Sequence, residues 1–142
     1  MIRYLLDTDA FSLWRAGNET LAMRLRPALA EGAVAVSVIA VEEQLGGWFS
    51  LLRRANSPER EARIYAEISR SMALFALVPV LPLTETALVR FEALKRERLN
   101  IGAMDLRVTA LALDRNLIVV TRNRRDYVRV SGVSLEDWTI ET

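Results

Sequence analysis

The chain has 142 residues, of which 51% are hydrophobic, 26% charged and 7% aromatic, a composition typical of one folded domain and unlike a disordered tail. It contains no cysteine and no histidine, which excludes disulfides, thiolate metal sites, imidazole bases and Ser-His-Asp triads. Any chemistry therefore falls to carboxylates, hydroxyls, amides and guanidinium groups. A bound metal would be a hard cation held by oxygen.

The net charge of +1 differs from the strongly basic balance of a dedicated nucleic-acid binder. Of the 19 basic residues only Lys95 is a lysine, so nearly every cation is a guanidinium suited to bidentate phosphate or carboxylate contacts. Genomic base composition is an alternative source of this arginine bias. The first apolar run is interrupted by Asp7, unlike a signal peptide, and no run is long enough to span a membrane. We therefore expect a cytoplasmic protein without a membrane partner.

The first half of the chain alternates short apolar runs with helical patterns. Residues 2–6 predict a buried strand that ends at Asp7. Apolar residues at helical spacing predict two helices between Thr8 and about Leu29, with a break at 16–18 and Gly32 closing the second helix. Residues 33–36 predict a second strand, and Ser37 is placed to cap a helix over 38–54.

The second half continues the alternation. Ser57 as cap and Pro58 at the first helical position predict a long helix to about Leu77. Prolines on both sides restrict residues 80–81 to a short or edge strand. Thr84 is placed to cap a helix to about residue 99, and a further helix over 105–115 precedes a strand at 117–121. Residues 128–139 are ambiguous and could add an edge strand.

This order of elements predicts an α/β fold. Short strands that alternate with helices of ten or more residues form a mostly parallel sheet with helices on both faces. No internal repeat, low-complexity tract or long linker divides the chain, so we expect a single domain over residues 1–142. Such folds bind ligands at the carboxyl ends of the strands.

Acidic and amide side chains from distant parts of the chain fall near this edge of the predicted sheet: Asp7, Asp9, Glu42, Glu43, Asp105, Asn123 and Asp126. Three carboxylates about 4 Å apart repel one another by roughly 4 kcal/mol a pair, which approaches the stability of a whole domain. They must take up protons, pair with arginines or hold a divalent cation. All-oxygen ligation of Mg²⁺ or Mn²⁺ is the metal-binding interpretation.

A carboxylate-bound metal suits the hydrolysis of phosphodiesters, because it lowers the pKa of a bound water without needing a histidine base. Each acid also has an ordinary structural role. Asp7 could end a strand or cap a helix, and Asp9 is a still better candidate to cap the first helix. Glu42 and Glu43 point about 100° apart on a helix, so at most one of them faces the site. The placement of all these acidic and amide side chains near one edge of the sheet favours a metal site.

Four segments resemble the PIN-domain family, in particular its VapC-like toxin ribonucleases: YLLDTDAFS, SVIAVEEQLGG, IGAMDLRVTALAL and VVTRNRRDYVRVSGVSLEDW. They occur in the family's order over almost the full chain. The resemblance implies a PIN-like three-layer sandwich and a metal-dependent endoribonuclease with Mg²⁺ or Mn²⁺ as cofactor. It also implies an RNA substrate, a homodimer, and a cognate VapB-like antitoxin whose C-terminal segment covers the active site.

The resemblance implies that Asp7, Glu43 and Asp105 are the metal-binding acids. It selects Glu43 over Glu42, because the family's helix glutamate lies three residues after a position that is usually Thr and four before a Gly. Ala40 and Gly47 occupy those two positions here.

The fourth acidic position of the family falls two residues after Thr121, where this chain departs from the pattern with Asn123. The resemblance then implies that Asn123 or Asp126 completes the catalytic set, with Asp126 supplying the missing charge. Thr121 would contact the substrate or the water around the metal.

Other interpretations are open. Residues 6–9 also fit the start of haloacid-dehalogenase-type phosphatases, but Phe11 lies where those proteins have Thr or Val, and the later lysine and acidic pair are missing. A response-regulator receiver lacks support because Lys95 lies in mid-helix. A catalytically degraded PIN-fold module that binds RNA or protein is compatible with Asn123. The stretch 72–83 and the helix from Trp48 could form a dimer face or ordinary core.

Overall fold

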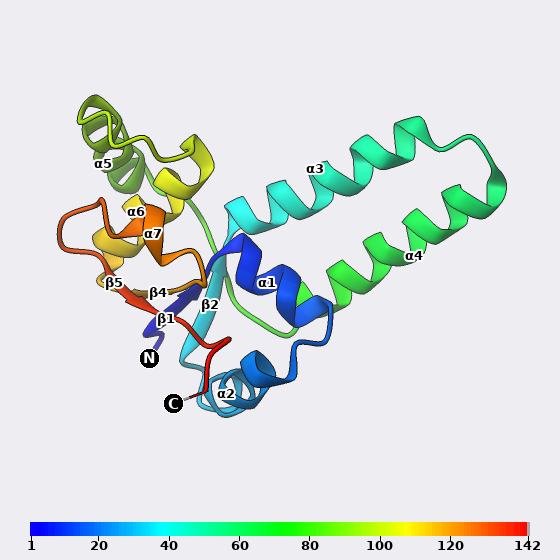
Figure 1. Ribbon diagram of the computed structural model, residues 1–142, viewed down its shortest axis with the longest axis horizontal. Helices are drawn as coiled ribbons and strands as arrows, with labels where there is room; N and C mark the ends of the chain where they lie inside the picture. The colour runs from blue at the N-terminus through cyan, green and yellow to red at the C-terminus, as the bar shows by residue number, and fades with distance from the viewer. Residues whose placement is uncertain (142) are drawn as a thin grey trace.

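The structure is a computed structural model that describes residues 1–141, with a parallel sheet lying between two layers of helices (Figure 1). The strand order in the five-stranded sheet is β3-β2-β1-β4-β5, and every neighbouring pair is parallel. The strands are β1 (Tyr4–Leu6), β2 (Val34–Ser37), β3 (Val80–Leu81), β4 (Ile118–Val120) and β5 (Ser134–Glu136). The helices are α1 (Thr8–Arg15), α2 (Glu19–Ala30), α3 (Val38–Arg54), α4 (Pro58–Phe75), α5 (Glu85–Arg96), α6 (Ala103–Arg115) and α7 (Arg124–Tyr127).

The central strand β1 is buried on both faces. Side chains alternate along a strand, so Leu6 packs with α1 and α2 on one face while Leu5 packs with α5 and α6 on the other. In the register, Tyr4 lies between Val34 of β2 and Ile118 of β4. The three-layer α/β sandwich and the parallel sheet are therefore confirmed.

Helix caps follow the predicted chemistry at most positions. The side chains of Asn18, Ser57 and Thr84 each accept a hydrogen bond from the backbone of the helix that follows. Ser37 does occupy the N-cap position of α3, but its buried hydroxyl forms no hydrogen bond with that helix. The cap of α1 is Asp7, so the assignment of that role to Asp9 was wrong.

Several predicted boundaries shift. The first strand begins at Tyr4 and not at residue 2, because the backbone N–H groups of Arg3 and Tyr4 both donate to Ala33 before the regular ladder starts. Helix α4 ends at Phe75, α5 ends at Arg96 and α6 starts at residue 103. Residues 124–127 form the short helix α7, and the ambiguous C-terminal segment supplies the parallel edge strand β5.

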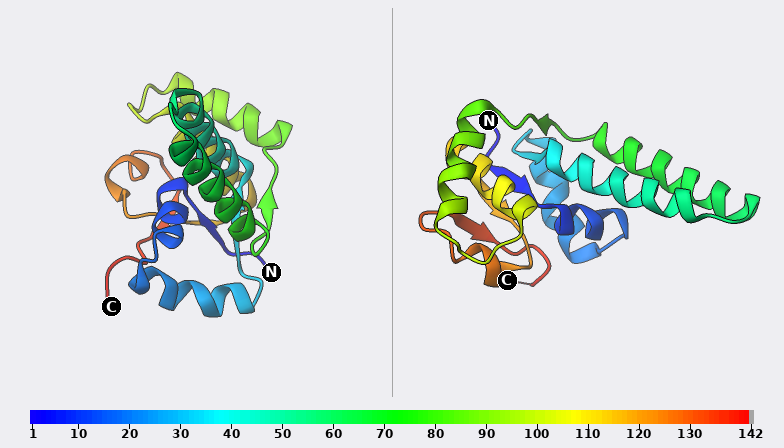
Figure 2. Two further views of the ribbon diagram at one scale, coloured as in Figure 1. Left: turned by 90° about the vertical axis from the view of Figure 1, so that its right-hand side faces the viewer. Right: turned by 90° about the horizontal axis from the view of Figure 1, so that it is seen from above.

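The hairpin of α3 and α4 extends away from the sheet (Figures 1 and 2). At its base Phe75 stacks on Phe11 with ring centroids 4.2 Å apart, which joins α4 to α1 and to the core. The stretch 72–83 is thus divided between core side chains such as Phe75 and Leu81 and exposed ones such as Met72. Within residues 1–141, no helix has the length and apolar character that crossing a membrane requires.

Candidate active site

Asp7 lies where β1 ends and α1 begins. Its carboxylate accepts a hydrogen bond of 2.8 Å from the backbone N–H of Ala10, and only 3% of the residue is exposed. Burial raises the pKa of Asp7 to about 6, and repulsion from Asp9 and Asp105 acts in the same direction, against hydrogen bonds with Thr121 and Ala10. The negative charge on Asp7 is therefore poorly compensated by its surroundings.

Asp105 lies in the first turn of α6, close enough to Asp7 for the two charges to repel each other. Partial burial raises its pKa, with smaller contributions from Asp126 and Asp9, while a hydrogen bond from Tyr127 lowers it. The hydroxyl of Tyr127 lies 3.3 Å from Oδ1 of Asp105. Asp7 and Asp105 thus share one partly desolvated environment.

Tyr127 is the residue that sequence reasoning missed. It is fully buried on α7, and its pKa is raised by burial and by the nearby charges of Asp7 and Asp105. Its hydroxyl donates to Asp105, and the charge of Asp7 is close enough to act on it. An available signal was that a buried tyrosine needs a polar partner for its hydroxyl, and that it follows directly on the predicted site residue Asp126.

Glu43 is turned toward the start of α1, where the hydroxyl of Thr8 donates to its Oε1 at 2.6 Å. Glu42 is exposed, so one glutamate of the pair faces inward as helix geometry requires. Within residues 1–141, however, no three acidic side chains are grouped closely enough to surround a metal ion. The structure brings Asp7 and Asp105 together and leaves Glu43 bound to Thr8.

The remaining predicted residues follow β4. Asn123 donates from its backbone N–H to the hydroxyl of Thr121 at 2.9 Å and from its side-chain amide to Asp126 at 2.9 Å. Thr121 is buried beside Asp7. These contacts place Thr121, Asn123 and Asp126 at the same edge as Asp7 and Asp105.

Asp9 forms a bidentate ion pair with Arg122, with nitrogen–oxygen distances of 2.7 and 3.1 Å. The pair joins the first turn of α1 to the end of β4. Asp9 raises the pKa of Arg122 through this hydrogen-bonded contact. The carboxylate of Asp9 is thereby engaged by a cation.

Asp7 and Asp105 differ from Asp9 in this respect. Among residues 1–141, neither Asp7 nor Asp105 forms an ion pair. Their oxygen donors fit a hard divalent cation, which would supply the missing positive charge. Parallel α/β domains bind ligands at the carboxyl ends of their strands, and these two carboxylates lie near that edge of the sheet.

The family is shown by direct comparison. The model of the PIN domain family matches residues 4–133, so the chain belongs to this family. It is 30% identical over 140 residues to a protein of Shigella flexneri named tRNA(fMet)-specific endonuclease VapC, covering 98% of this chain and 100% of the relative. A protein of the same name from Salmonella typhimurium is 29% identical, and the alignment covers 97% of this chain and 99% of the relative.

Solved structures agree on the fold. DNA-bound VapBC from Salmonella typhimurium matches with a TM-score of 0.77 and 23% identity, covering 97% of this chain and 99% of that one. VapBC2 from Rickettsia felis, bound to a DNA fragment of its promoter, gives a TM-score of 0.78 at 20% identity, with coverage of 97% and 99%. At these identities the likeness shows the fold alone.

Proposed function

We propose that the chain is an endoribonuclease and the toxin of a type II toxin–antitoxin pair. The observation that carries the proposal is that Asp7, which is buried, and Asp105, which is partly buried, lie close together and form no ion pair within residues 1–141. Its support from relatives is the full-length similarity to proteins named as endonucleases. Their names make tRNA the first RNA class to test.

The acids would hold one Mg²⁺ or Mn²⁺, with Asp7 and Asp105 as ligands and Glu43 joining them from α3. Such an ion lowers the pKa of a bound water and neutralises charge on the phosphate. Thr121 would fix Asp7 and contact the substrate, while Tyr127 would orient Asp105. Asn123 and Asp126 would complete the catalytic set, with Asp126 contributing charge and Asn123 positioning it.

Two protein partners belong to the proposal. The solved neighbours are VapBC assemblies, which supports a VapB-like antitoxin as the partner of this chain. A homodimer is the second. Exposed apolar side chains, among them Met72 and Leu77, offer surface for such contacts.

A second candidate function rests on Asn123. Its amide donates to Asp126, so it occupies that carboxylate and adds no charge of its own. A chain with this departure could bind RNA or protein without cleaving it.

Cleavage of RNA by purified protein tests both candidates. We expect discrete fragments from tRNA(fMet) or from total RNA with Mg²⁺ or Mn²⁺, and none in EDTA. Asp7→Asn, purified identically, controls for contaminating nucleases and should cleave nothing. Metal-independent cleavage, or cleavage by the variant equal to that of the wild type, would contradict the proposed site. RNA binding without cleavage by folded protein would favour the binding module.

A further inference from the structure

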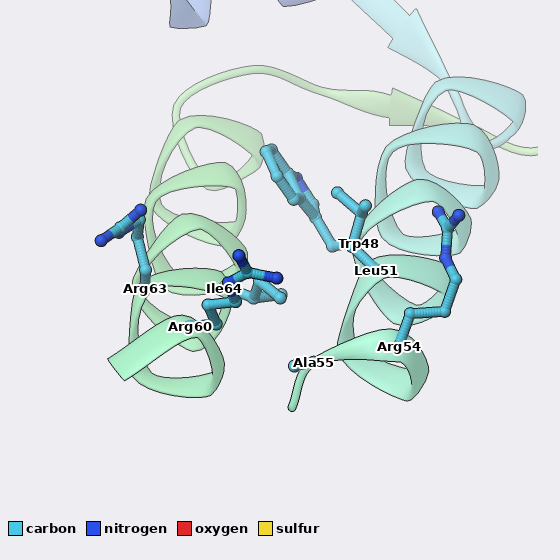
Figure 3. A pocket seen from close by; sticks show the side chains of 7 residues that line it. All are labelled: Trp48, Leu51, Arg54, Ala55, Arg60, Arg63 and Ile64. Atoms are coloured by element: carbon cyan, nitrogen blue, oxygen red, sulfur yellow. The ribbon is translucent and has the colours of Figure 1, made fainter. Parts of the chain in front are cut away.

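A groove lies between α3 and α4, near the loop that connects them and far from the sheet. It encloses about 570 Å³. Figure 3 shows Trp48 reaching from α3 into the space between the helices, and Arg60 projecting from α4 into the same space. Trp48 is fixed there, because its indole N–H donates to Ser71 and its ring packs against the guanidinium of Arg15.

The charged side chains that line this groove are all cationic. Its lining includes Arg54, Arg60 and Arg63 and no acidic side chain. Among the ion pairs within residues 1–141, only Arg63 of these three takes part, with Glu59 at 2.9 Å, and both side chains are highly exposed. Exposed pairs of this kind neutralise little. The groove is therefore lined by arginine side chains that are largely free to bind an anion. Figure 3 shows the guanidinium group of Arg60 over the space between the helices and those of Arg54 and Arg63 at its outer sides.

Helix electrostatics do not explain the arrangement. Arg54 lies in the last turn of α3, where a cation is favourable. Arg60 lies in the first turn of α4, where the helix dipole makes a cation unfavourable. Three arginines around one opening, one of them in an electrostatically unfavourable position, form a cluster suited to an anionic ligand.

A second groove lies between these arginines and Glu43. It is lined by Glu43, Gly47, Trp48 and Leu51, and it shares Trp48 and Leu51 with the first. Glu43, Gly47, Leu51 and Arg54 recur at three- or four-residue spacing and so lie along one face of α3. Arg54 is roughly 16 Å along the helix axis from Glu43 at 1.5 Å per residue.

We propose that the groove of Arg54, Arg60 and Arg63 binds the phosphate backbone of the RNA substrate at a distance from the cleavage site. This inference rests on the proposed endoribonuclease function and specifies how the substrate is held. The track from Glu43 along α3 to the arginines would align several nucleotides beyond the scissile bond. Guanidinium groups suit bidentate phosphate contacts, and a nearby aromatic ring suits the bases.

RNA binding by the full chain tests the inference independently of cleavage. The probe is a fluorescein-labelled single-stranded RNA of mixed sequence, titrated in EDTA at several salt concentrations. The variant is Arg54→Ala/Arg60→Ala/Arg63→Ala. Its charge-matched control is Arg90→Ala/Arg96→Ala/Arg115→Ala, because these three arginines are also exposed but lie on α5 and α6.

We expect the groove variant to raise the Kd by about tenfold or more and to lower the salt slope by about 2, since each phosphate contact to a single strand contributes about 0.7. The control should change both much less. Equal effects of the two variants, or no RNA binding by the wild type, would overturn the inference. So would a groove variant that binds RNA normally but loses affinity for polyglutamate, which would identify a protein-docking surface.

The same experiment separates the two proposals. A wild type that binds RNA through the arginines but cleaves none with Mg²⁺ would overturn the ribonuclease function and keep the groove. If the wild type cleaves RNA and the groove variant has an unchanged Kd and cleavage rate, the ribonuclease function is kept and the groove proposal is overturned.

Discussion

Asp7 combines two roles that oppose each other energetically. As the N-cap of α1 it stabilises the helix by accepting from Ala10. As a buried carboxylate with a raised pKa it destabilises the folded state whenever it is ionised. Substitutions that retain one role and remove the other can therefore separate them.

We expect Asp7→Asn to raise the free energy of unfolding at pH 8 in EDTA by about 1–3 kcal/mol, because it keeps a capping oxygen and removes the buried charge. Asp7→Ala removes the charge and the cap together, so it should be less stable than Asp7→Asn by about 1 kcal/mol. Urea unfolding of the three proteins measures both differences. Two variants of equal stability would contradict the capping role.

The pH dependence of stability follows from the same raised pKa. Asp7 binds its proton more tightly in the folded protein, so its contribution to stability is complete below pH 4 and is lost as pH rises through about 6. The shift from 3.8 corresponds to roughly 3 kcal/mol. In EDTA, the wild type should lose stability relative to Asp7→Asn between pH 4 and 7. A gain over that range would contradict the assignment.

Tyr127→Phe tests the hydroxyl near the two acids. The ring stays packed, but Asp105 loses a hydrogen bond that lowers its pKa. We expect the acid limb of the pH–rate profile for RNA cleavage to move to higher pH and stability to fall by about 1 kcal/mol. Tyr65→Phe, at an exposed site on α4, is the control. An unmoved profile would leave Tyr127 with a packing role alone.

The sequence predicted that Asp7 and Asp105 lie near each other at the sheet edge, and it missed the hydroxyl of Tyr127 beside Asp105. Asp7 and Asp105 follow from strand ends and helix starts, because parallel strands bring their carboxyl ends to one edge. The hydroxyl of Tyr127 depends on the path of the turn after β4, which periodicity does not encode. The engagement of Asp9 by Arg122 and of Glu43 by Thr8 likewise depends on tertiary packing.

At the scale of elements, a stacked pair of aromatic rings joins α4 of the α3–α4 hairpin to α1 and the core. Phe11 of α1 and Phe75 of α4 stack with an interplanar angle of 6°, and both are buried. Their sequence spacing predicted helical faces but not this partnership. The observed helix ends differ from the predicted ones by a few residues, because residue patterns do not encode the tertiary contacts at which a helix stops.

Phe11→Ala should lower the free energy of unfolding by about 3–5 kcal/mol, because it opens a cavity under the stacked ring of Phe75. Phe49→Ala removes the same atoms from α3 at a site that is 44% exposed, and it should cost much less. Chemical denaturation of both variants compares them. Similar losses would contradict the role of the Phe11–Phe75 stack in anchoring the hairpin.

At the scale of the whole molecule, the alternation of elements predicted a parallel α/β sandwich, and the structure has one. The strand order was not predictable to the same degree, because residue patterns do not say which edge each strand joins. Leu6 belongs to the core on one face of the sheet and Leu5 to the core on the other, and Asp7 follows them directly in the chain. Ligand binding there should therefore affect the stability of the entire domain.

We expect Mg²⁺ to raise the melting temperature of the wild type, since a ligand at a hundred times its Kd contributes about 2.7 kcal/mol. Asp7→Asn, which lacks one proposed ligand, should show a much smaller rise. Calorimetry with and without Mg²⁺ measures both. An equal rise in the two proteins would place the bound ion away from Asp7.

The central strand also fixes when the site can exist during synthesis. Residues at the start of the chain form β1, yet Tyr4 pairs with Ile118, and Asp7 meets Thr121 and Tyr127. A nascent chain on the ribosome carries Asp7 and Glu43 long before β4 emerges, and such distant pairing forms late. The acids therefore assemble only as translation ends, and a chain released before β4 has no assembled site.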